Sequence, residues 1–176
     1  YTIPYQMPED CRIDLIEIIK PNGTRTAIDL KKQSKTVVNT SSMGSNIYNP
    51  NDKIIKVNVS GLEVGYILHY KMYDNIRHPR ARGIFADMFI LEQTRPILYK
   101  EIYVKGPADF PLKRITLKDE PEKSKVEYEH PVANDKTAHR WVVRNIPQAF
   151  PEPNMPPLYM SVWRLLMSTA PDWQSV

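Results

Sequence analysis

Apolar and polar residues alternate along most segments of this 176-residue chain, and this period of two constrains the fold more than any other feature. Between Lys53 and Ser60, for example, Ile55, Val57 and Val59 alternate with polar residues. Successive side chains of a β-strand point to opposite faces of a sheet, so this segment is expected to be a strand with one buried face. Similar segments recur about every 8–12 residues with turn signals between them, which is typical of a β-sandwich or a β-barrel.

The prolines independently disfavour helices. The chain has 16 prolines, where average usage would give about 9, and a proline inside a helix costs about 3 kcal/mol. Residues 147–157 hold five prolines and no glycine, so we expect them to run extended, near polyproline II. Composition and periodicity together predict an all-β fold, an antiparallel β-sandwich of about ten to thirteen strands with little helix.

The expected strands can be located from the alternation and the turns. Residues 13–18 are apolar on nearly both faces, which predicts a central strand covered on both sides. Pro21-Asn22-Gly23 predicts a hairpin turn, because Asn-Gly readily supplies positive φ. Residues 39–53 are expected to form a long loop with room for a short strand at 46–48, and 158–169 fit either a strand or a short helix. Further strands are expected at 24–30, 53–60, 66–74, 86–93, 97–104, 112–117, 126–130 and 139–144.

Charge and hydropathy exclude two kinds of partner. The 24 basic and 20 acidic residues are mixed along the chain, with a net charge of +4, and the densest basic segment is residues 77–82. A nucleic-acid-binding protein would present a basic stripe with interleaved aromatic residues, so no nucleic-acid partner is expected. No stretch approaches the roughly 18 consecutive apolar residues of a membrane span.

The domain organisation is expected to be simple. The sequence begins without an initiator methionine, which favours a mature fragment or a trimmed chain. Its length corresponds to one domain, or to one domain with an appendage. We expect residues 1–157 to form one β-sandwich and residues 158–176 to supply its final strand or strands and a linker.

Cysteine and histidine show no pattern of a catalytic or metal site. Cys11 is the only cysteine, which rules out an internal disulfide and any CxxC site, and it is expected to be structural. His69, His78, His130 and His139 lack the spacings of metal ligands, although His69 and His139 each fall in an expected strand and could be neighbours on a sheet. No metal and no cofactor are expected.

Carboxylates and aromatic residues leave two binding hypotheses open. Asp87, Glu92, Glu101 and Asp109 could supply the carboxylate pair of a glycosidase, although a solvated surface is the commoner role for acidic residues at this density. The 10 Tyr, 4 Phe and 3 Trp could form a platform that stacks on sugar rings, although packing of aromatic residues across strands is commoner. The tyrosines that lie close together are Tyr66, Tyr70 and Tyr73, and Tyr99 and Tyr103 share one strand face.

Four groups of residues, in order along nearly the whole chain, match the motifs of one family. Pro21-Asn22-Gly23 corresponds to its hairpin, and Gly61 to Gly65 followed by YILHY corresponds to "lkvGdiieY", with Tyr66 where an Asp is common. Residues 89–107 correspond to its "fq…Pv…v..P" stretch. The C-terminal motif "W…n.pa…Ep.mPp…St…W" is matched by Trp141, Asn145, Pro147, Glu152-Pro153, Pro156-Pro157, Ser168 and Asp172-Trp173.

These motifs resemble the bacterial domain of unknown function that lies immediately upstream of transglutaminase-like, papain-like domains in secreted or periplasmic proteins, most often of Bacteroidetes. The resemblance implies a β-sandwich that is not itself an enzyme, with a periplasmic or extracellular location. It also implies a partner in the same chain, a transglutaminase-like domain with Cys, His and Asp after Val176. The implied function is that of a non-catalytic accessory domain, which packs on that neighbour or presents substrate to it. The alternative is a carbohydrate- or peptide-binding sandwich that uses a Tyr/Trp surface.

The proline-rich segment, residues 147–157, and the tryptophans Trp141 and Trp173 are the candidates for an interdomain or structural role. Glu152 is the one charged residue within this segment. It could anchor the segment through an ion pair to Arg144 or Arg164, or it could face solvent. The candidate residues are Trp141, Glu152, Pro153, Pro156, Pro157 and Trp173.

Overall fold

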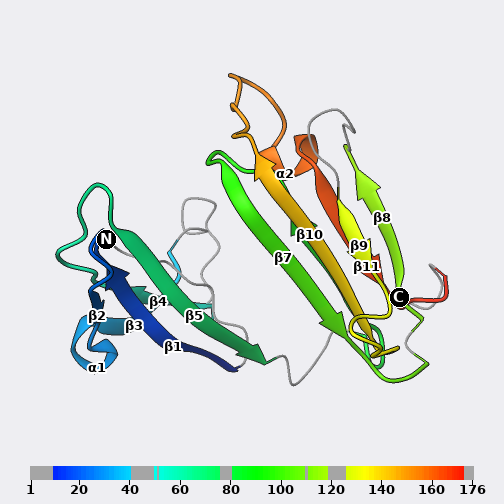
Figure 1. Ribbon diagram of the computed structural model, residues 1–176, viewed down its shortest axis with the longest axis horizontal. Helices are drawn as coiled ribbons and strands as arrows, with labels where there is room; N and C mark the ends of the chain where they lie inside the picture. The colour runs from blue at the N-terminus through cyan, green and yellow to red at the C-terminus, as the bar shows by residue number, and fades with distance from the viewer. Residues whose placement is uncertain are drawn as a thin grey trace. The chain divides into compact units, whose positions relative to one another are not determined.

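The computed structural model describes residues 10–40, 50, 52–75, 81–109, 111–118 and 126–172, and its strands fall into two compact units (Figure 1). The units comprise Tyr1–Arg80 and Ala81–Val176. The described ranges contain eleven strands and two four-residue helices, and every strand pairing is antiparallel. The expected all-β fold is therefore confirmed. Within these ranges, no helix has the length and the apolar character to cross a membrane.

The first unit packs a three-stranded sheet against a hairpin. The sheet has the order β2-β1-β5, with β1 (Asp10–Ile19) between β2 (Arg25–Ala27) and β5 (Ile67–Asn75). The hairpin pairs β3 (Ser34–Val38) with β4 (Lys53–Val57), and α1 (Leu30–Gln33) directly precedes β3. The buried cluster of this unit draws on both parts and consists of Ile16, Ile18, Val57 and Val59.

The second unit is a sandwich of two three-stranded sheets. One sheet has the order β7-β10-β9, with bounds Ile97–Lys105, Ala138–Ile146 and Glu127–Glu129. The other has the order β6-β11-β8, with bounds Ala86–Ile90, Arg164–Ser168 and Lys113–Leu117, and α2 (Leu158–Ser161) lies just before β11. Side chains from both sheets form one buried cluster: Leu91, Ile102, Val104, Trp141, Val143, Ile146, Trp163, Leu165 and Met167.

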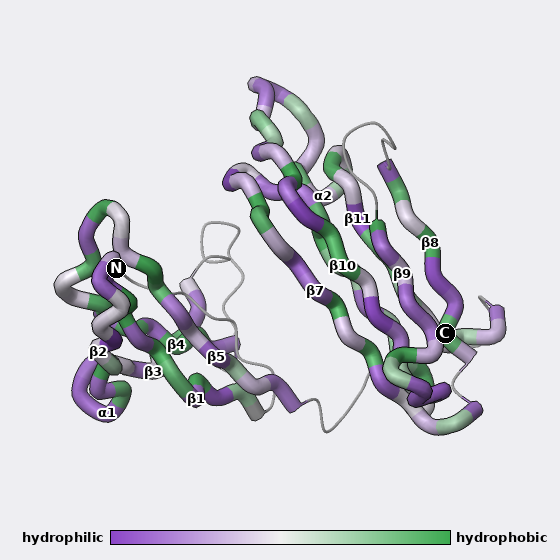
Figure 2. Tube along the Cα trace, viewed as in Figure 1, coloured by the Kyte–Doolittle hydropathy of each residue, from purple (hydrophilic) through white to green (hydrophobic). Residues whose placement is uncertain are grey.

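The alternation seen in the sequence produces these cores. Hydrophobic and hydrophilic residues alternate along the strands of both units (Figure 2). In β4, Val57 is fully buried while its neighbour Asn58 is exposed. The segment that is apolar on both faces became the central strand β1, where the consecutive residues Ile16, Glu17 and Ile18 are all buried.

The hairpin after β1 forms as the Pro-Asn-Gly motif predicts. Gly23 has φ +82°, and its N–H donates to the carbonyl of Lys20 at 2.9 Å. The N–H of Thr24 donates to Oδ1 of Asn22 at 3.0 Å. An L-residue with a side chain is strained at such a φ, so the glycine sets the position of this turn.

The domain organisation differs from the expected single sandwich over residues 1–157. Each unit has its own pair of sheets and its own apolar cluster, so the strands divide at Arg80. Residues 158–169 were expected to be either a strand or a short helix, and they contain both. The helix α2 comes first, and β11 follows as the central strand of its sheet. The short elements α1 and β3 were not anticipated, and the expected strand at 46–48 lies outside the described residues.

Replacing Leu165 with alanine is expected to destabilise the second unit by about 2–5 kcal/mol, because Leu165 lies between the two sheets and is 1% exposed. The control is Leu98→Ala in β7, where the side chain is 77% exposed, with an expected change of at most about 0.5 kcal/mol. Urea unfolding followed by tryptophan fluorescence measures both. Equal losses for the two variants would contradict this core assignment.

Candidate functional site

The proline-rich segment lies on the surface of the second unit. Glu152, Pro153, Pro156 and Pro157 are all exposed. The N–H of Glu152 donates to the sulfur of Met155 at 2.9 Å, and the N–H of Met155 donates back to the carbonyl of Glu152 at 3.3 Å. The segment therefore makes a local turn around Met155 within its extended path.

The two arginines proposed as partners of Glu152 are engaged elsewhere. Arg144 Nη1 lies 2.5 Å from Oε1 of Glu127, and Arg164 donates to the carbonyl of Tyr159. Glu152 faces solvent, and no ion pair joins it to another described residue. The anchoring hypothesis is therefore not supported.

Trp141 and Trp173 were the remaining candidates. Trp141 is 3% exposed and belongs to the core of the sandwich, so its role is structural. Trp173 lies outside the described residues.

The histidines are arranged differently from the expectation. His69 lies in β5 of the first unit and His139 in β10 of the second, so they belong to different sheets and the predicted neighbourhood is wrong. His139 instead stacks on His130, with ring centroids 4.0 Å apart and planes 1° apart. The register that pairs Glu129 with Arg140 brings residue 130 opposite residue 139 across the turn at 133–137, and the periodicity of the sequence does not specify this register. His78 lies outside the described part of the chain.

The imidazole stack is part of an aromatic cluster at the edge of the sandwich. The hydroxyl of Tyr128 lies 3.0 Å from Nδ1 of His139, and Nδ1 of His130 donates to the carbonyl of Ala138 at 2.9 Å. Arg114 of β8 lies over the Tyr128 ring at 3.7 Å, which joins the edge strands of the two sheets. Burial lowers the pKa of His139, and the charges of His130 and Arg114 lower it further. This cluster holds the edge of the sandwich together and favours a neutral His139.

A buried carboxylate in the first unit was missed by the sequence reading. Glu17 of β1 is 7% exposed, and its Oε1 lies 2.7 Å from Nδ1 of His69 and 2.8 Å from Nη1 of Arg25. The hydrogen bond from His69, together with Arg25, holds the pKa of Glu17 below its ordinary value although burial acts in the opposite direction. The Glu17 carboxylate on β1 thus binds side chains on both neighbouring strands, β2 and β5.

Among the described residues, the other candidates for a catalytic or metal-binding role lie apart from one another. Cys11 is buried in β1. Glu92 accepts from the N–H of Trp163 at 3.3 Å, and Asp87 accepts from the N–H of Met88 at 2.7 Å. In the part of the chain that the structure describes, no three His, Cys, Asp or Glu side chains gather in a way that could hold a metal ion.

The outer face of sheet β7-β10-β9 carries exposed tyrosines in a network of charges. Tyr99 and Tyr103 are 50% and 51% exposed. Glu101 lies between them on β7 and accepts from Tyr99, and Arg140 on β10 lies 3.2 Å from both Glu101 and Glu129. The hydrogen bonds from Arg140 and then Tyr99 lower the pKa of Glu101. This face is a polar aromatic surface built on tyrosine.

The outer face of sheet β6-β11-β8 is apolar along its middle. Leu166 of β11 lies opposite Met88 on β6 and opposite Ile115 on β8. Met88 and Ile115 are 41% and 56% exposed, and a shallow hollow of about 680 Å³ lies over these strands. We call these three residues the apolar strip. Lys113 and Asp87 are at its margin, so the strip is an apolar line with a charged rim.

The stability of the protein is expected to fall as the pH drops below about 6.5, because the unfolded chain protonates His139 more readily than the folded one. In the window between the lowered folded pKa and the ordinary value of 6.5, the unfolded state binds more protons, so acidification favours unfolding. His139→Gln should reduce this loss, whereas Tyr128→Phe keeps the imidazole and should retain it. Urea midpoints between about pH 7.5 and pH 5.5 measure the slopes. An unchanged slope in His139→Gln would refute this assignment.

Comparisons with known proteins give one similar solved structure and one matching family. A solved structure from Parabacteroides distasonis ATCC 8503, described as that of a "putative protease", is similar with a TM-score of 0.74 and 18% sequence identity over 99% of this chain. This chain covers 34% of that protein, so it spans about a third of its length, and the likeness shows the fold alone. No curated protein matches. A family model described as a domain of unknown function with a solved structure, DUF3857, matches residues 1–150. The chain therefore belongs to the DUF3857 family.

Proposed function

We propose that this chain is a non-catalytic accessory part of a larger protease- or transglutaminase-type protein, and that it packs on a neighbouring domain of the same polypeptide. The observation that carries the proposal is the apolar strip of Met88, Leu166 and Ile115 on an outward sheet face. The similar bacterial protein, about three times as long, supports it, because its extra length provides a neighbour for such a surface.

The strip has the composition of an interface. An antiparallel sheet with one face on the core normally presents polar residues on the other face. Here three apolar side chains follow one another across three strands. Protein interfaces combine an apolar centre with a polar rim, and contiguous exposed apolar surface marks such sites. Burial of these side chains against a partner would remove them from water at a gain of about 25 cal/mol per Å².

The position of β11 favours a neighbour that follows in the chain. Leu166 lies in the last described strand, and residues 169–176 extend at most about 28 Å beyond it. A domain that begins after Val176 would therefore be tethered close to the strip, which raises its effective concentration there. We propose that this domain is transglutaminase-like, with a Cys, a His and an Asp, and that the protein is periplasmic or extracellular. The gene sequence beyond Val176 tests this, and a stop codon there would contradict it.

The rate of Met88 oxidation measures whether the strip is covered. Met88 and Met160 are similarly exposed, at 41% and 48%, and Met160 lies in α2 and does not line the hollow over the strip. In the natural polypeptide extended past Val176, hydrogen peroxide should oxidise Met88 several-fold more slowly than in the 176-residue chain, with Met160 as the matched control. Peptide mass spectrometry gives both rates.

An Ile115→Lys variant provides the second readout. It should lower the melting temperature of the extended protein and leave that of the 176-residue chain nearly unchanged, because Ile115 is exposed when the strip is uncovered. Equal oxidation of Met88 in the two proteins would refute docking at the strip.

A second candidate function is carbohydrate or peptide binding on the outer face of β7-β10-β9. The observation in its favour is that Tyr99 and Tyr103 are half exposed on one face, beside the charged groups of Glu101 and Arg140. Aromatic faces stack on sugar rings and peptide side chains, and neighbouring charges orient polar groups. Trp141 and Trp163 are buried, so among the described residues the expected Tyr/Trp surface consists of tyrosine.

Binding by the 176-residue chain to a glycan or peptide array tests this second function. Tyr103→Ala should weaken any such binding at least tenfold, because its exposed ring supplies the stacking surface. Tyr159→Ala is the control, since Tyr159 is 46% exposed but precedes β11 in α2. Binding that survives both substitutions would exclude this face.

A further inference from the structure

The segment that contains the β3–β4 hairpin is rich in lysine. Residues 30–60 contain five lysines and one aspartate, a net charge of +4, which equals the net charge of the whole chain. Residues 39–52, which join β3 to β4, carry one charged side chain, Asp52. The remaining residues are neutral in sum, although they include the densest basic segment, residues 77–82, and an anionic ligand is attracted to both basic segments.

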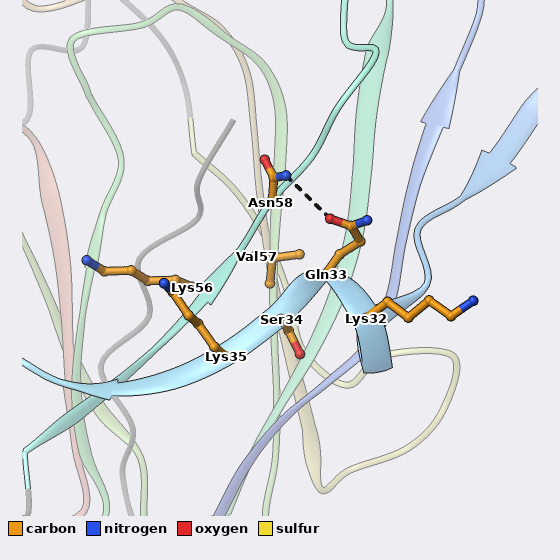
Figure 3. A pocket seen from close by; sticks show the side chains of 7 residues that line it. All are labelled: Lys32, Gln33, Ser34, Lys35, Lys56, Val57 and Asn58. Atoms are coloured by element: carbon orange, nitrogen blue, oxygen red, sulfur yellow. Dashed lines mark hydrogen bonds between the residues drawn. The ribbon is translucent and has the colours of Figure 1, made fainter.

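The strand register places two of these lysines directly opposite each other. Lys35 of β3 pairs with Lys56 of β4 in the antiparallel ladder. Directly opposed side chains lie about 5 Å apart at Cβ, and like charges in such a pair are destabilising. Both ammonium groups reach to the same side of the hairpin, whereas Lys32 extends the other way (Figure 3).

Within the described part of the chain, no acidic side chain compensates this pair of lysines. Among the described residues, neither Lys35 nor Lys56 has an ion pair. Lys32, by contrast, has Asp29 at 3.6 Å. The uncompensated repulsion between Lys35 and Lys56 is the feature that a bound anion would remove.

The surroundings of the pair suit an oxyanion. The two lysines lie in a polar hollow of about 520 Å³. Gln33 and Asn58 also line this hollow, and Nδ2 of Asn58 lies 3.4 Å from Oε1 of Gln33. The Gln33 amide group points away from the ammonium groups of Lys35 and Lys56 (Figure 3), so those two ammonium groups are the donors that an anion would meet. Of the three lysines in the described lining, Lys32 extends away from the pair, and no carboxylate belongs to that lining.

We infer that Lys35 and Lys56 form a binding site for an oxyanion group, a phosphate or a carboxylate, on the β3–β4 hairpin. The anion lies between the two ammonium groups and accepts hydrogen bonds from both. Binding replaces repulsion by two attractive contacts, so it stabilises the first unit. This site is independent of the apolar strip and goes beyond the accessory role.

Thermal unfolding of the 176-residue chain with inorganic pyrophosphate as the probe tests the site. The melting temperature should rise as pyrophosphate is added up to about 10 mM, because a ligand that binds only the folded state stabilises it. Sodium chloride at the same ionic strength should not reproduce the rise. In Lys35→Glu, the new Glu faces Lys56, so the melting temperature without anion should increase while the response to pyrophosphate is lost.

Two further variants separate this site from general charge effects. Lys20→Glu changes the net charge equally at the exposed turn after β1, and it should keep the full pyrophosphate response. Lys56→Met should weaken the apparent affinity at least tenfold, and Lys56→Arg should retain most of it. An unchanged response in Lys35→Glu, or an equal loss in Lys20→Glu, would overturn the inference.

Citrate distinguishes the source of the oxyanion. A response to both citrate and pyrophosphate supports a site that accepts carboxylates and phosphates alike, and a response to pyrophosphate alone supports a phosphoryl ligand. A response to neither anion would overturn the proposal.

Discussion

Each unit depends on one layer of apolar side chains that holds two small sheets together. In the second unit, Trp141 of β10 and Leu165 of β11 meet in this layer, and in the first unit Ile16 of β1 and Val57 of β4 do so. A three-stranded sheet is marginal alone and becomes stable when one face is covered. In the central strand β11 every second residue is committed to the core, whereas β1 and β10 each bury three consecutive residues, 16–18 and 141–143. The remaining residues of these sheets are free to form outer faces with other roles.

The outer faces differ in chemistry although they are built from the same alternation. The face of β7-β10-β9 balances its charges internally, since Arg140 lies between Glu101 and Glu129. The β3–β4 hairpin leaves the Lys35–Lys56 pair unbalanced. The face of β6-β11-β8 has little polar character along Met88, Leu166 and Ile115. A face whose charges are balanced internally gains little electrostatic free energy when it binds a charged partner. An unbalanced charge pair gains free energy when it binds an opposite charge, and an apolar line gains free energy when a partner removes it from water.

Local signals predicted the elements well, and long-range contacts limited the prediction of sites. The turn at Gly23 and the strand around Val57 depend on a few neighbouring residues, so both could be inferred. Glu152 illustrates the limit, because its proposed partner Arg144 had another carboxylate, Glu127, within reach on the paired strand. The pairing of His130 with His139 required the register of β9 and β10, which periodicity does not specify.

By itself, the sequence determined that the chain is all-β, where most strands begin and end, and that each strand has two unlike faces, because side-chain alternation is a local property of the backbone. The tertiary structure decided that the strands divide into two units, that Glu17 is a buried carboxylate, and that Lys35 meets Lys56 while Leu166 meets Met88 and Ile115. These pairings join residues far apart in the chain. They are selected by which sheets cover each other's apolar faces, and a pattern within one strand cannot specify that choice.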